Sequence, residues 1–274
     1  MDSGGTRDEA LARVVDFFLR QNGFEEQAAI VLRQALNEVI DGMRTGRWSL
    51  DSLQKTEKTY IGTKVEILFK FEFELPDGES LDARIEGEEI DIKCTVRNSW
   101  MIPEEAFGKL CLLVRIDDRK SRFSIGVVRV DPMRLSHGRN RDRKATISVS
   151  SGQDIHWVVE NGKLPINLIG SLSAEARDAI FAKPLGTRRI AELFRQVHGV
   201  KIPRAVLETL AKQQDPTRRA REAREILAGE GIEVLQGHWK DDRARARALG
   251  CLDLGSSEWI AFGTGSQAES IQDR

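Results

Sequence analysis

Two aspartates and a lysine form the pattern in this sequence with the clearest chemical meaning. Asp82 is followed, after eight residues, by Asp91-Ile92-Lys93. Because side chains alternate along a strand, Asp91 and Lys93 are expected on one face, roughly 6–7 Å apart. Asp82 joins them if its own segment pairs with that strand. Two carboxylates at a sheet edge suit a hard divalent ion such as Mg²⁺, which polarises a phosphate and activates a water, while the lysine neutralises developing charge.

The spacing is that of the D…(D/E)xK nucleases, although alternating charges on the solvent-facing side of a sheet give the same pattern. Glu66 favours the nuclease, because it is expected on the helix that precedes these strands. Gly62 and Thr59 lie on the same line of that helix, and a glycine there lets DNA or a metal approach closely. The alternative is an ordinary exposed helix glutamate.

Cationic residues surround the start of the same helix. Arg44 and Arg47 precede it, and Lys55 and Lys58, with threonines between them, are expected in its first turns. A helix N-terminus with such donors suits a DNA phosphate. Ordinary capping with solvated charges is the alternative for these residues.

Several of these blocks, taken together, resemble one known family. The stretch Arg44-Thr45-Gly46-Arg47-Trp48, followed by Lys55-Thr56-Glu57-Lys58-Thr59 and Gly62-Thr63-Lys64-Val65-Glu66, resembles the corresponding part of the NaeI family of restriction endonucleases. The resemblance continues through Asp82, Asp91 and Lys93, and then through Arg177-Asp178, Ile180-Phe181, Glu192–Gly199 and Arg204-Ala205-Val206. It therefore covers nearly the whole chain in order.

The resemblance implies a homodimer that cuts double-stranded DNA with Mg²⁺ and binds two copies of its site, one of which acts as an effector at the C-terminal domain. Carried over by position, the catalytic residues are Glu66, Asp82, Asp91 and Lys93, and the three carboxylates are the metal ligands. A GC-rich six-base palindrome and a cognate DNA methyltransferase as genetic partner are also implied. Two departures are visible: Ile92 stands where the family can have cysteine, and the C-terminal region is shorter.

The expected elements describe an α/β protein with two domains. Helices are expected within 7–44, with a break at 21–23, and over 53–71; strands are expected over 81–86, 89–96, 109–116 and 122–130. This order indicates an α/β or α+β domain with a mixed sheet, and the family resemblance implies that residues 1–160 form a restriction-endonuclease-like domain with a central mixed sheet. A stretch rich in Ser, Gly, Asn and Pro, 150–172, marks the expected boundary.

Residues 165–274 are expected to form the second domain. Helices are predicted over 188–197, with Thr187 as N-cap, from Pro203 to 213 and over 216–227, followed by short strands at 231–235 and 259–262. Three helices followed by strands are the order of a winged helix-turn-helix, a DNA-binding motif. Its candidate DNA-binding residues are Arg188, Arg189, Arg204, Thr209 and Lys212.

The net charge of −1 is unevenly distributed. Residues 134–224 carry 18 Lys and Arg and 9 Asp and Glu, a net charge of +9, which leaves −10 for the rest of the chain. This asymmetry favours a polyanionic partner, with solvated helix faces as the alternative. Within this stretch, Arg139, Arg141, Arg143 and Lys144 form a cationic loop suited to tracking DNA phosphates, or to a plain surface loop.

Composition excludes several other classes of protein. The chain is 40% hydrophobic and 31% charged, which is typical of a soluble globular protein. No apolar run approaches the roughly 20 residues that span a bilayer, and the polar start has no signal region. Cys94, Cys111 and Cys251 are scattered, which favours reduced thiols in the cytoplasm over disulfides or a zinc site.

The sequence therefore predicts a type II restriction endonuclease that cuts both strands of a short palindrome. Two-fold symmetry of the site calls for a homodimer. One alternative is a DNA-binding regulator with an inactive nuclease domain, which would bind specific DNA without Mg²⁺-dependent cleavage. The other is a nicking or modification-dependent endonuclease of the same fold, which would leave a supercoiled plasmid at the open-circle form.

Overall fold

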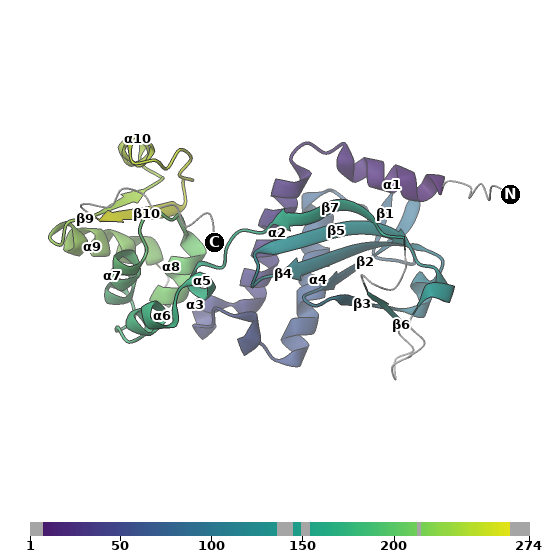
Figure 1. Ribbon diagram of the computed structural model, residues 1–274, viewed down its shortest axis with the longest axis horizontal. Coiled ribbons are helices and arrows are strands. Elements are labelled where there is room, and N and C mark those ends of the chain that lie inside the picture. Colours follow the sequence, from purple (N-terminus) through teal and green to yellow (C-terminus); the bar gives the residue numbers. More distant parts are fainter. Residues whose placement is uncertain (1–7, 136–144, 149–153, 213–214, 264–274) are drawn as a thin grey trace. The chain divides into compact units, whose positions relative to one another are not determined.

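The computed structural model describes residues 8–135, 145–148, 154–212 and 215–263, and the chain divides into two compact units. Unit 1 comprises residues 1–39 and 53–166, and unit 2 comprises residues 40–52 and 167–274 (Figure 1). A short segment between two helices of unit 1 therefore belongs to unit 2. The sequence analysis expected two consecutive domains, so it did not predict that residues 40–52 belong to unit 2. In the described part of the chain, no helix has the length and apolar character needed to cross a membrane.

Unit 1 is built on a five-stranded mixed sheet, as the sequence predicts. Its strand order is β1-β2-β4-β5-β7, in which β2 and β4 are parallel and the other pairs are antiparallel. The strands are β1 (Ala83–Ile85), β2 (Glu88–Thr95), β4 (Leu110–Asp117), β5 (Arg122–Arg129) and β7 (His156–Lys163). A second, two-stranded sheet pairs β3 (Ser99–Ile102) with β6 (Ala145–Ser148).

Three strands of unit 1 were not expected from the sequence, and β7 lies inside the stretch interpreted as a domain boundary. Most residues of β7 are exposed or half-buried because it forms the edge of the sheet next to β5. An edge strand carries polar residues on its exposed side, so its composition resembles that of a loop. The stretch 150–172 therefore contains a strand, and within it, after residue 166, the chain passes from unit 1 to unit 2.

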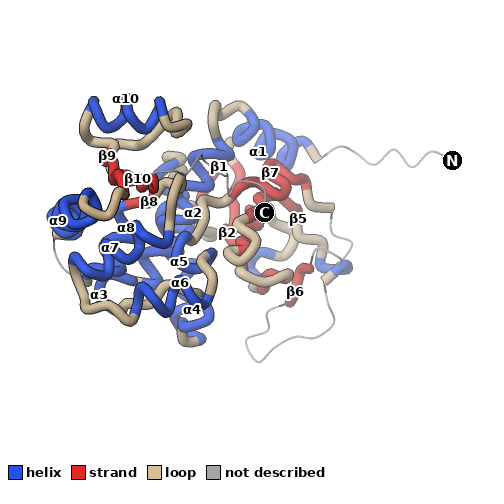
Figure 2. The backbone as a smooth tube through the Cα atoms, turned by 60° about the vertical axis from the view of Figure 1, so that its left-hand side comes forward, coloured by secondary structure: helices blue, strands red, loops and turns tan. Residues whose placement is uncertain are grey.

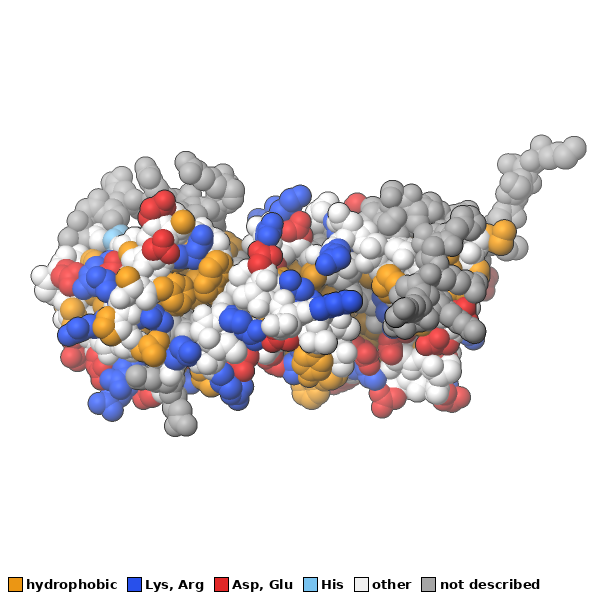
Figure 3. All heavy atoms as spheres, turned by 90° about the horizontal axis from the view of Figure 1, so that it is seen from below, with side chains coloured by type: hydrophobic (Ala, Val, Ile, Leu, Met, Phe, Trp, Pro, Cys, Tyr) orange, Lys and Arg blue, Asp and Glu red, His pale blue; other side chains and the backbone are white. Residues whose placement is uncertain are grey.

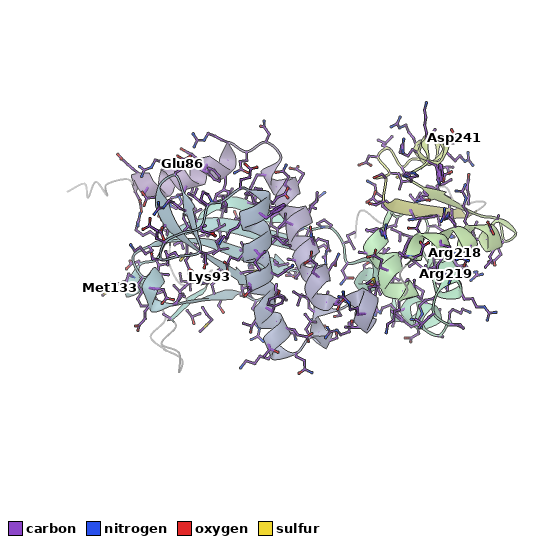
Figure 4. The ribbon with its side chains drawn as sticks, turned by 180° about the vertical axis from the view of Figure 1, so that it is seen from behind. Glu86, Lys93, Met133, Arg218, Arg219 and Asp241 are labelled. Carbon is purple, nitrogen blue, oxygen red and sulfur yellow. The ribbon has the colours of Figure 1, made fainter. Side chains whose placement is uncertain are left out.

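Helices cover one face of the main sheet. The long helices α2 (Phe24–Ile40) and α4 (Lys55–Glu72) lie in front of the strands when the molecule is seen from behind (Figure 4). The helix α1 (Glu9–Leu19) packs on β5 and β7. Apolar residues at helical spacing, Ile61, Val65 and Phe69 in α4, are the buried positions. These helices match the predicted ranges to within a few residues.

The strand β4 passes through the middle of the unit. Its run Leu110–Val114 is at most 1% exposed at every position, as expected for a strand covered on both faces. Cys111 and Leu113 pack with Trp100, Ile102 and Ile147 of the small sheet. The neighbouring strand β2 carries its charged residues on this same face, because Asp91 is the register partner of Cys111 and Lys93 that of Leu113.

Unit 2 combines helices with a three-stranded antiparallel sheet of order β8-β10-β9 (Figure 2). Its helices are α3 (Gly42–Thr45), α5 (Leu168–Ser171), α6 (Ala174–Phe181), α7 (Thr187–Gln196), α8 (Arg204–Ala211), α9 (Pro216–Ala228) and α10 (Lys240–Ala248). Its strands are β8 (Ile202–Pro203), β9 (Ile232–Gln236) and β10 (Glu258–Gly263). The three predicted helices and two predicted strands are found, and α10 is an unpredicted insertion between β9 and β10.

One capping prediction in unit 2 is wrong. Gly186, with φ 85°, is the N-cap of α7, and Thr187 is its first helical residue. The Thr187 hydroxyl instead donates a 2.5 Å hydrogen bond to Glu222 Oε2 on α9. The hydroxyl that was expected to cap α7 is therefore hydrogen-bonded to a residue of another helix.

Candidate active site

The hairpin of β1 and β2 brings Asp82 to the middle of β2. Its two-residue turn consists of Glu86 and Gly87, with φ 51° and 81°, and the register places Ala83 opposite Ile90. Asp82, just before β1, accepts a 2.7 Å hydrogen bond from the backbone N–H of Ile92. The carboxylate is therefore held by the backbone of the strand that carries the other two residues of the motif.

The loop before Asp82 is fixed by a second carboxylate of β2. Glu89 accepts hydrogen bonds of 2.9–3.0 Å from the backbone N–H groups of Glu79, Ser80 and Leu81. These backbone hydrogen bonds lower the pKa of Glu89 to about 2. Glu89 thus orders the chain that leads into the site without taking part in its chemistry.

Lys93 joins the two aspartates. Its Nζ lies 2.5 Å from Asp91 Oδ1 and 3.4 Å from Asp82 Oδ2. The prediction that Asp91 and Lys93 share a face and that Asp82 lies near them is met by these distances. Ile92, between them in sequence, is 4% exposed and alternates to the opposite face. Cys111 on β4 donates its thiol to Asp91 Oδ2 at 3.8 Å.

Burial and charge shift the pKa values of this cluster. Burial raises the pKa of Asp91 to about 6; Lys93 opposes the rise, and the neighbouring Asp82 adds to it. Burial alone would lower the pKa of Lys93, but its hydrogen bond and attraction to Asp91, together with the charge of Asp82, leave that pKa raised. The lysine is therefore a cation between two carboxylates that repel each other.

Asp82 and Asp91 fit two ligands of a divalent cation. Both offer the oxygen donors that Mg²⁺ prefers, and Mg²⁺ is commonly held by one or two carboxylates with water completing its shell. A bound cation would favour the ionised form of Asp91, whose pKa is raised chiefly by burial and further by the neighbouring Asp82. Across the described ranges, however, no group of three or more His, Cys, Asp or Glu side chains is arranged as a metal site.

Glu66 lies near this cluster on α4 but outside its contacts. Its Oε1 is 3.9 Å from Lys70, which also pairs with Asp77 at 2.6 Å. Burial, and then the negative charge of Asp82, raise the pKa of Glu66. Its role as a third ligand stays a prediction. Gly62, one turn earlier, has no atom within 4 Å of the position that a Cβ would take.

The four cationic residues predicted around the start of α4 are divided between the two units. Arg44 pairs with Asp41 at 3.2 Å, and Arg47 donates to the carbonyl of Ile40 at 3.2 Å; both belong to the segment 40–52 of unit 2. Lys55 and Lys58 are in the first turns of α4 in unit 1. The structure therefore does not gather them on one unit.

The predicted DNA-binding residues of unit 2 have mixed environments. Arg189 donates to the carbonyls of Phe181 and Lys183, and its guanidinium lies 5.2 Å from the Phe181 ring. Thr209 donates to the carbonyl of Ala205 and lies against Gly42 of α3. Both side chains are thus engaged in holding the unit together.

The remaining members of that set are nearer to solvent. Arg188 is exposed, and Arg204 pairs with Glu208 at 2.8 Å. Lys212 ends α8 with φ 48°, and its side chain lies beside Gly46. The cationic loop of Arg139, Arg141, Arg143 and Lys144 lies outside the described residues.

The sequence analysis missed the arginines of α9. Arg218 and Arg219 lie close together on this helix (Figure 4), where both engage Glu222 at 3.0 and 2.9 Å. Arg224 pairs with Asp242 of α10 at 2.7 Å. The arginine-rich run that follows Asp215-Pro216 is the signal in the sequence that could have singled out these residues.

Comparison with known proteins decides the family. The model of the restriction endonuclease NaeI family matches residues 12–264. The chain belongs to the NaeI family of restriction endonucleases. It is 38% identical over 254 residues to the type II restriction enzyme NaeI of Lentzea aerocolonigenes, a match that covers 89% of this chain and 80% of that enzyme. The resemblance inferred from the sequence motifs is confirmed, and the NaeI family is one of site-specific deoxyribonucleases.

Proposed function

We propose that this NaeI-family chain makes Mg²⁺-dependent double-strand cuts in a short, GC-rich palindrome. The observation that carries the proposal is the position of Lys93 Nζ, 2.5 Å from Asp91 and 3.4 Å from Asp82. A lysine beside two carboxylates, here on β2 and just before β1 of the mixed sheet, is an arrangement suited to phosphodiester hydrolysis with a divalent ion. Glu66 is proposed to complete the catalytic set from α4.

Each residue has a definite task in this proposal. Asp82 and Asp91 hold Mg²⁺, which supplies Lewis-acid activation of the phosphate and of the attacking water when bound. Lys93 exchanges its hydrogen bond to Asp91 for one to the water or to a phosphate oxygen, and it offsets the charge that develops there. Glu66, whose raised pKa reflects first its burial and then the charge of Asp82, is proposed as the third carboxylate that would hold the ion, from the helix side.

Unit 2 is proposed to be a winged helix-turn-helix that binds a second, effector copy of the site. The order α7, β8, α8, α9, β9, β10 and the strand order β8-β10-β9 support this assignment. The helix α9, with Arg218 and Arg219, is then the element that enters the groove. On the face shown in Figure 3, Lys and Arg side chains are intermixed with Asp and Glu. DNA binding would therefore depend on where individual Lys and Arg side chains lie, not on a continuous basic surface.

The remaining parts of the proposal concern assembly and context. A palindrome has two-fold symmetry, so we propose a homodimer in which each chain cuts one strand. Residues 1–160 and 165–274 are proposed as the endonuclease and effector domains, with α3 of the segment 40–52 attached to the second. We also propose a cognate methyltransferase as genetic partner. A cytoplasmic location is proposed as well, which the three cysteines support because all are free thiols.

The proposal is tested by digesting an unmethylated phage genome with purified protein, in Mg²⁺ and in EDTA, with and without an oligonucleotide effector. Sequencing of the fragment ends identifies the site. We expect discrete fragments that require Mg²⁺ and share one palindrome. Specific DNA binding without cleavage under every condition would instead identify a regulator, and a supercoiled plasmid left at the open-circle form would identify a nicking enzyme.

A further inference from the structure

Unit 2 contains a cavity of about 430 Å³ that the proposed cleavage reaction does not use. It is bordered by α8, by the first turns of α9 and by the two loops that flank α10; its lining includes Arg204, Arg221, Gln236, Trp239, Ser256 and Ser257. This volume is in the range of pockets that hold small ligands. The cavity therefore has room for more than a single water or ion.

The two loops that border the cavity contact each other through the backbones of two glycines. A Cβ on Gly237 would lie 1.9 Å from the carbonyl oxygen of Gly255, so the two backbones touch. Gly237 also donates its N–H to the carbonyl of Glu258 at 2.9 Å. This contact places two lining residues close to each other at the opening of the cavity: Trp239 on one loop and Ser256 on the other.

The insertion α10 is anchored in the same region. Asp242 accepts hydrogen bonds from Arg224 at 2.7 and 3.2 Å and from the backbone N–H of Gln236 at 2.8 Å. Asp242 is 8% exposed, and a buried carboxylate paired with an arginine and a backbone N–H fixes its element firmly. The cavity is therefore built by tertiary contacts rather than by a loose surface loop.

Two polar side chains that line the cavity, those of Gln236 and Arg221, have no protein partner among the described residues. Gln236 is 8% exposed, yet its side-chain amide makes no hydrogen bond there, and it opens into the cavity. The guanidinium of Arg221 is likewise unpaired within the described ranges, unlike those of Arg218, Arg219 and Arg224 on the same helix. Because buried polar groups are nearly always hydrogen-bonded, the unpaired amide of Gln236 points to a polar ligand in the cavity. Arg221 is exposed and lines the same cavity, so its guanidinium is free to contact that ligand.

An aromatic surface stands beside these polar groups. Trp239 is 51% exposed, and its protein ring contact is an edge-to-face one with His238 at 5.1 Å. Bases stack on such indoles irrespective of sequence, an amide can hydrogen-bond a base edge, and an arginine suits a phosphate. A phosphate ion alone would not use the indole, and an apolar ligand would not use the arginine. A nucleotide would use the indole, the amide and the arginine together.

We propose that this cavity binds a single nucleotide, with its base stacked on Trp239 and hydrogen-bonded by Gln236, and its phosphate held by Arg221. The nucleotide is either free or an unpaired nucleotide of a DNA strand; both present the same base, sugar and phosphate. The proposal goes beyond duplex binding by unit 2 and does not require the chain to cleave DNA. All measurements that test it can therefore be made in EDTA.

The test compares three fluorescent probes with the full-length protein: free 2-aminopurine deoxyribonucleoside monophosphate, a short duplex with one extra unpaired 2-aminopurine, and the same duplex fully paired. We expect the unpaired probe to bind about tenfold or more tightly than the paired one. Trp239→Ala and Arg221→Gln should each remove most of that preference. Leu252→Ala, at a residue that is 71% exposed and outside the lining, and Arg247→Gln on α10 are the matched controls.

The probes also separate the two sources of nucleotide. Binding of the free monophosphate, lost in both cavity variants, supports a free nucleotide as ligand; binding of the unpaired duplex alone supports a strand nucleotide. Equal binding of paired and unpaired duplexes, with no response to the free monophosphate, would overturn the proposal. So would a preference that survives in Trp239→Ala and Arg221→Gln proteins whose circular dichroism and Tm match the wild type.

Discussion

The ammonium group of Lys93 lies 2.5 Å from Asp91 Oδ1, two residues earlier on the same strand. Strand geometry puts both side chains on one face, but burial makes the contact close, since the Asp91 side chain is 5% exposed and that of Lys93 is 25% exposed. In the proposed reaction, a cation on Asp91 competes with this ion pair. Asp91 would hold the cation with the carboxylate that Lys93 now contacts, so the bound ion would weaken this ion pair and Lys93 would be freer to contact DNA.

Replacement of Lys93 by alanine should abolish cleavage and leave DNA binding largely intact. The variant lacks the cation that offsets charge on the phosphate, and loss of one such stabilising group costs roughly 10²–10³ in rate. Gel-based cleavage and fluorescence anisotropy on the same duplex measure the two properties. Lys120→Ala, at a surface lysine with a 79% exposed side chain, is the matched control. Cleavage at the wild-type rate in the Lys93 variant would refute the assignment.

The cleavage rate should fall as the pH drops through about 6. The pKa of Asp91 is raised to about 6, chiefly by burial, so protons compete with Mg²⁺ for this carboxylate below that pH. The raised pKa of Lys93 keeps the ammonium charged well above neutrality, so no loss from Lys93 is expected up to pH 9.

The measurement for this prediction is a pH–rate profile at several Mg²⁺ concentrations. Because metal and proton compete for one site, the acidic midpoint should move to lower pH as the Mg²⁺ concentration rises. For folding, the sign is opposite to that of a salt-bridged acid: a folded-state pKa above 3.8 makes Asp91 contribute more stability as the pH falls from about 6 toward 4. A midpoint that ignores Mg²⁺ would show that Asp91 is not the ligand.

The sequence predicted that Asp82, Asp91 and Lys93 lie close together because the geometry of this cluster is local. Asp91 and Lys93 are two residues apart on a strand, and Asp82 reaches them through a hairpin whose turn, Glu86-Gly87, is visible in the sequence. Within the DxK motif, the alternation of side chains along a strand is enough to place the aspartate and the lysine on one face. Glu66 was expected as a catalytic residue and third metal ligand, but it lies on a different element, and the position of a helix beside a strand does not follow from spacing along the chain. In the structure Glu66 is a neighbour of the cluster.

Features that depend on long-range packing were not predictable in this way. Thr209 was expected at a DNA surface, but α3 covers it, because a segment more than 160 residues earlier in the chain docks on α8. The edge strand β7 lacks a clear apolar alternation, and α10 interrupts a strand pair that would otherwise be a short hairpin. In each case a tertiary contact, not local propensity, decides the structure.

Substitution of Gly62 by alanine should stabilise the protein and impair cleavage. No atom lies within 4 Å of the added Cβ, and alanine is favoured over glycine in a helix interior by about 1 kcal/mol, so Tm should rise by roughly 2–4 °C. If DNA passes over this turn of α4, one turn before Glu66, the methyl group should raise KM for DNA on the order of tenfold. Thr63→Ala, at the exposed neighbouring position, is the control; an unchanged KM would exclude close approach of DNA here.

Substitution of Gly42 by alanine should destabilise unit 2. The added Cβ would lie 2.3 Å from Thr209 Oγ1 and 2.8 Å from the carbonyl oxygen of Arg47, and overpacking of this kind costs about 1–3 kcal/mol. Urea denaturation measures the loss. Gly229→Ala is the matched control, because its nearest neighbour is the Ile226 carbonyl oxygen at 3.6 Å, so it should change the free energy of unfolding little.

The partner of this clash can be removed to test its cause. Thr209→Ala eliminates the hydroxyl and the methyl group that meet the new Cβ, whereas the Arg47 carbonyl remains at 2.8 Å. The double variant should therefore recover part of the stability lost in Gly42→Ala, with a coupling free energy of about 0.5–3 kcal/mol, the usual size for residues in contact. Additive losses would mean that α3 does not pack on α8, and residues 40–52 would then have to be assigned to unit 1.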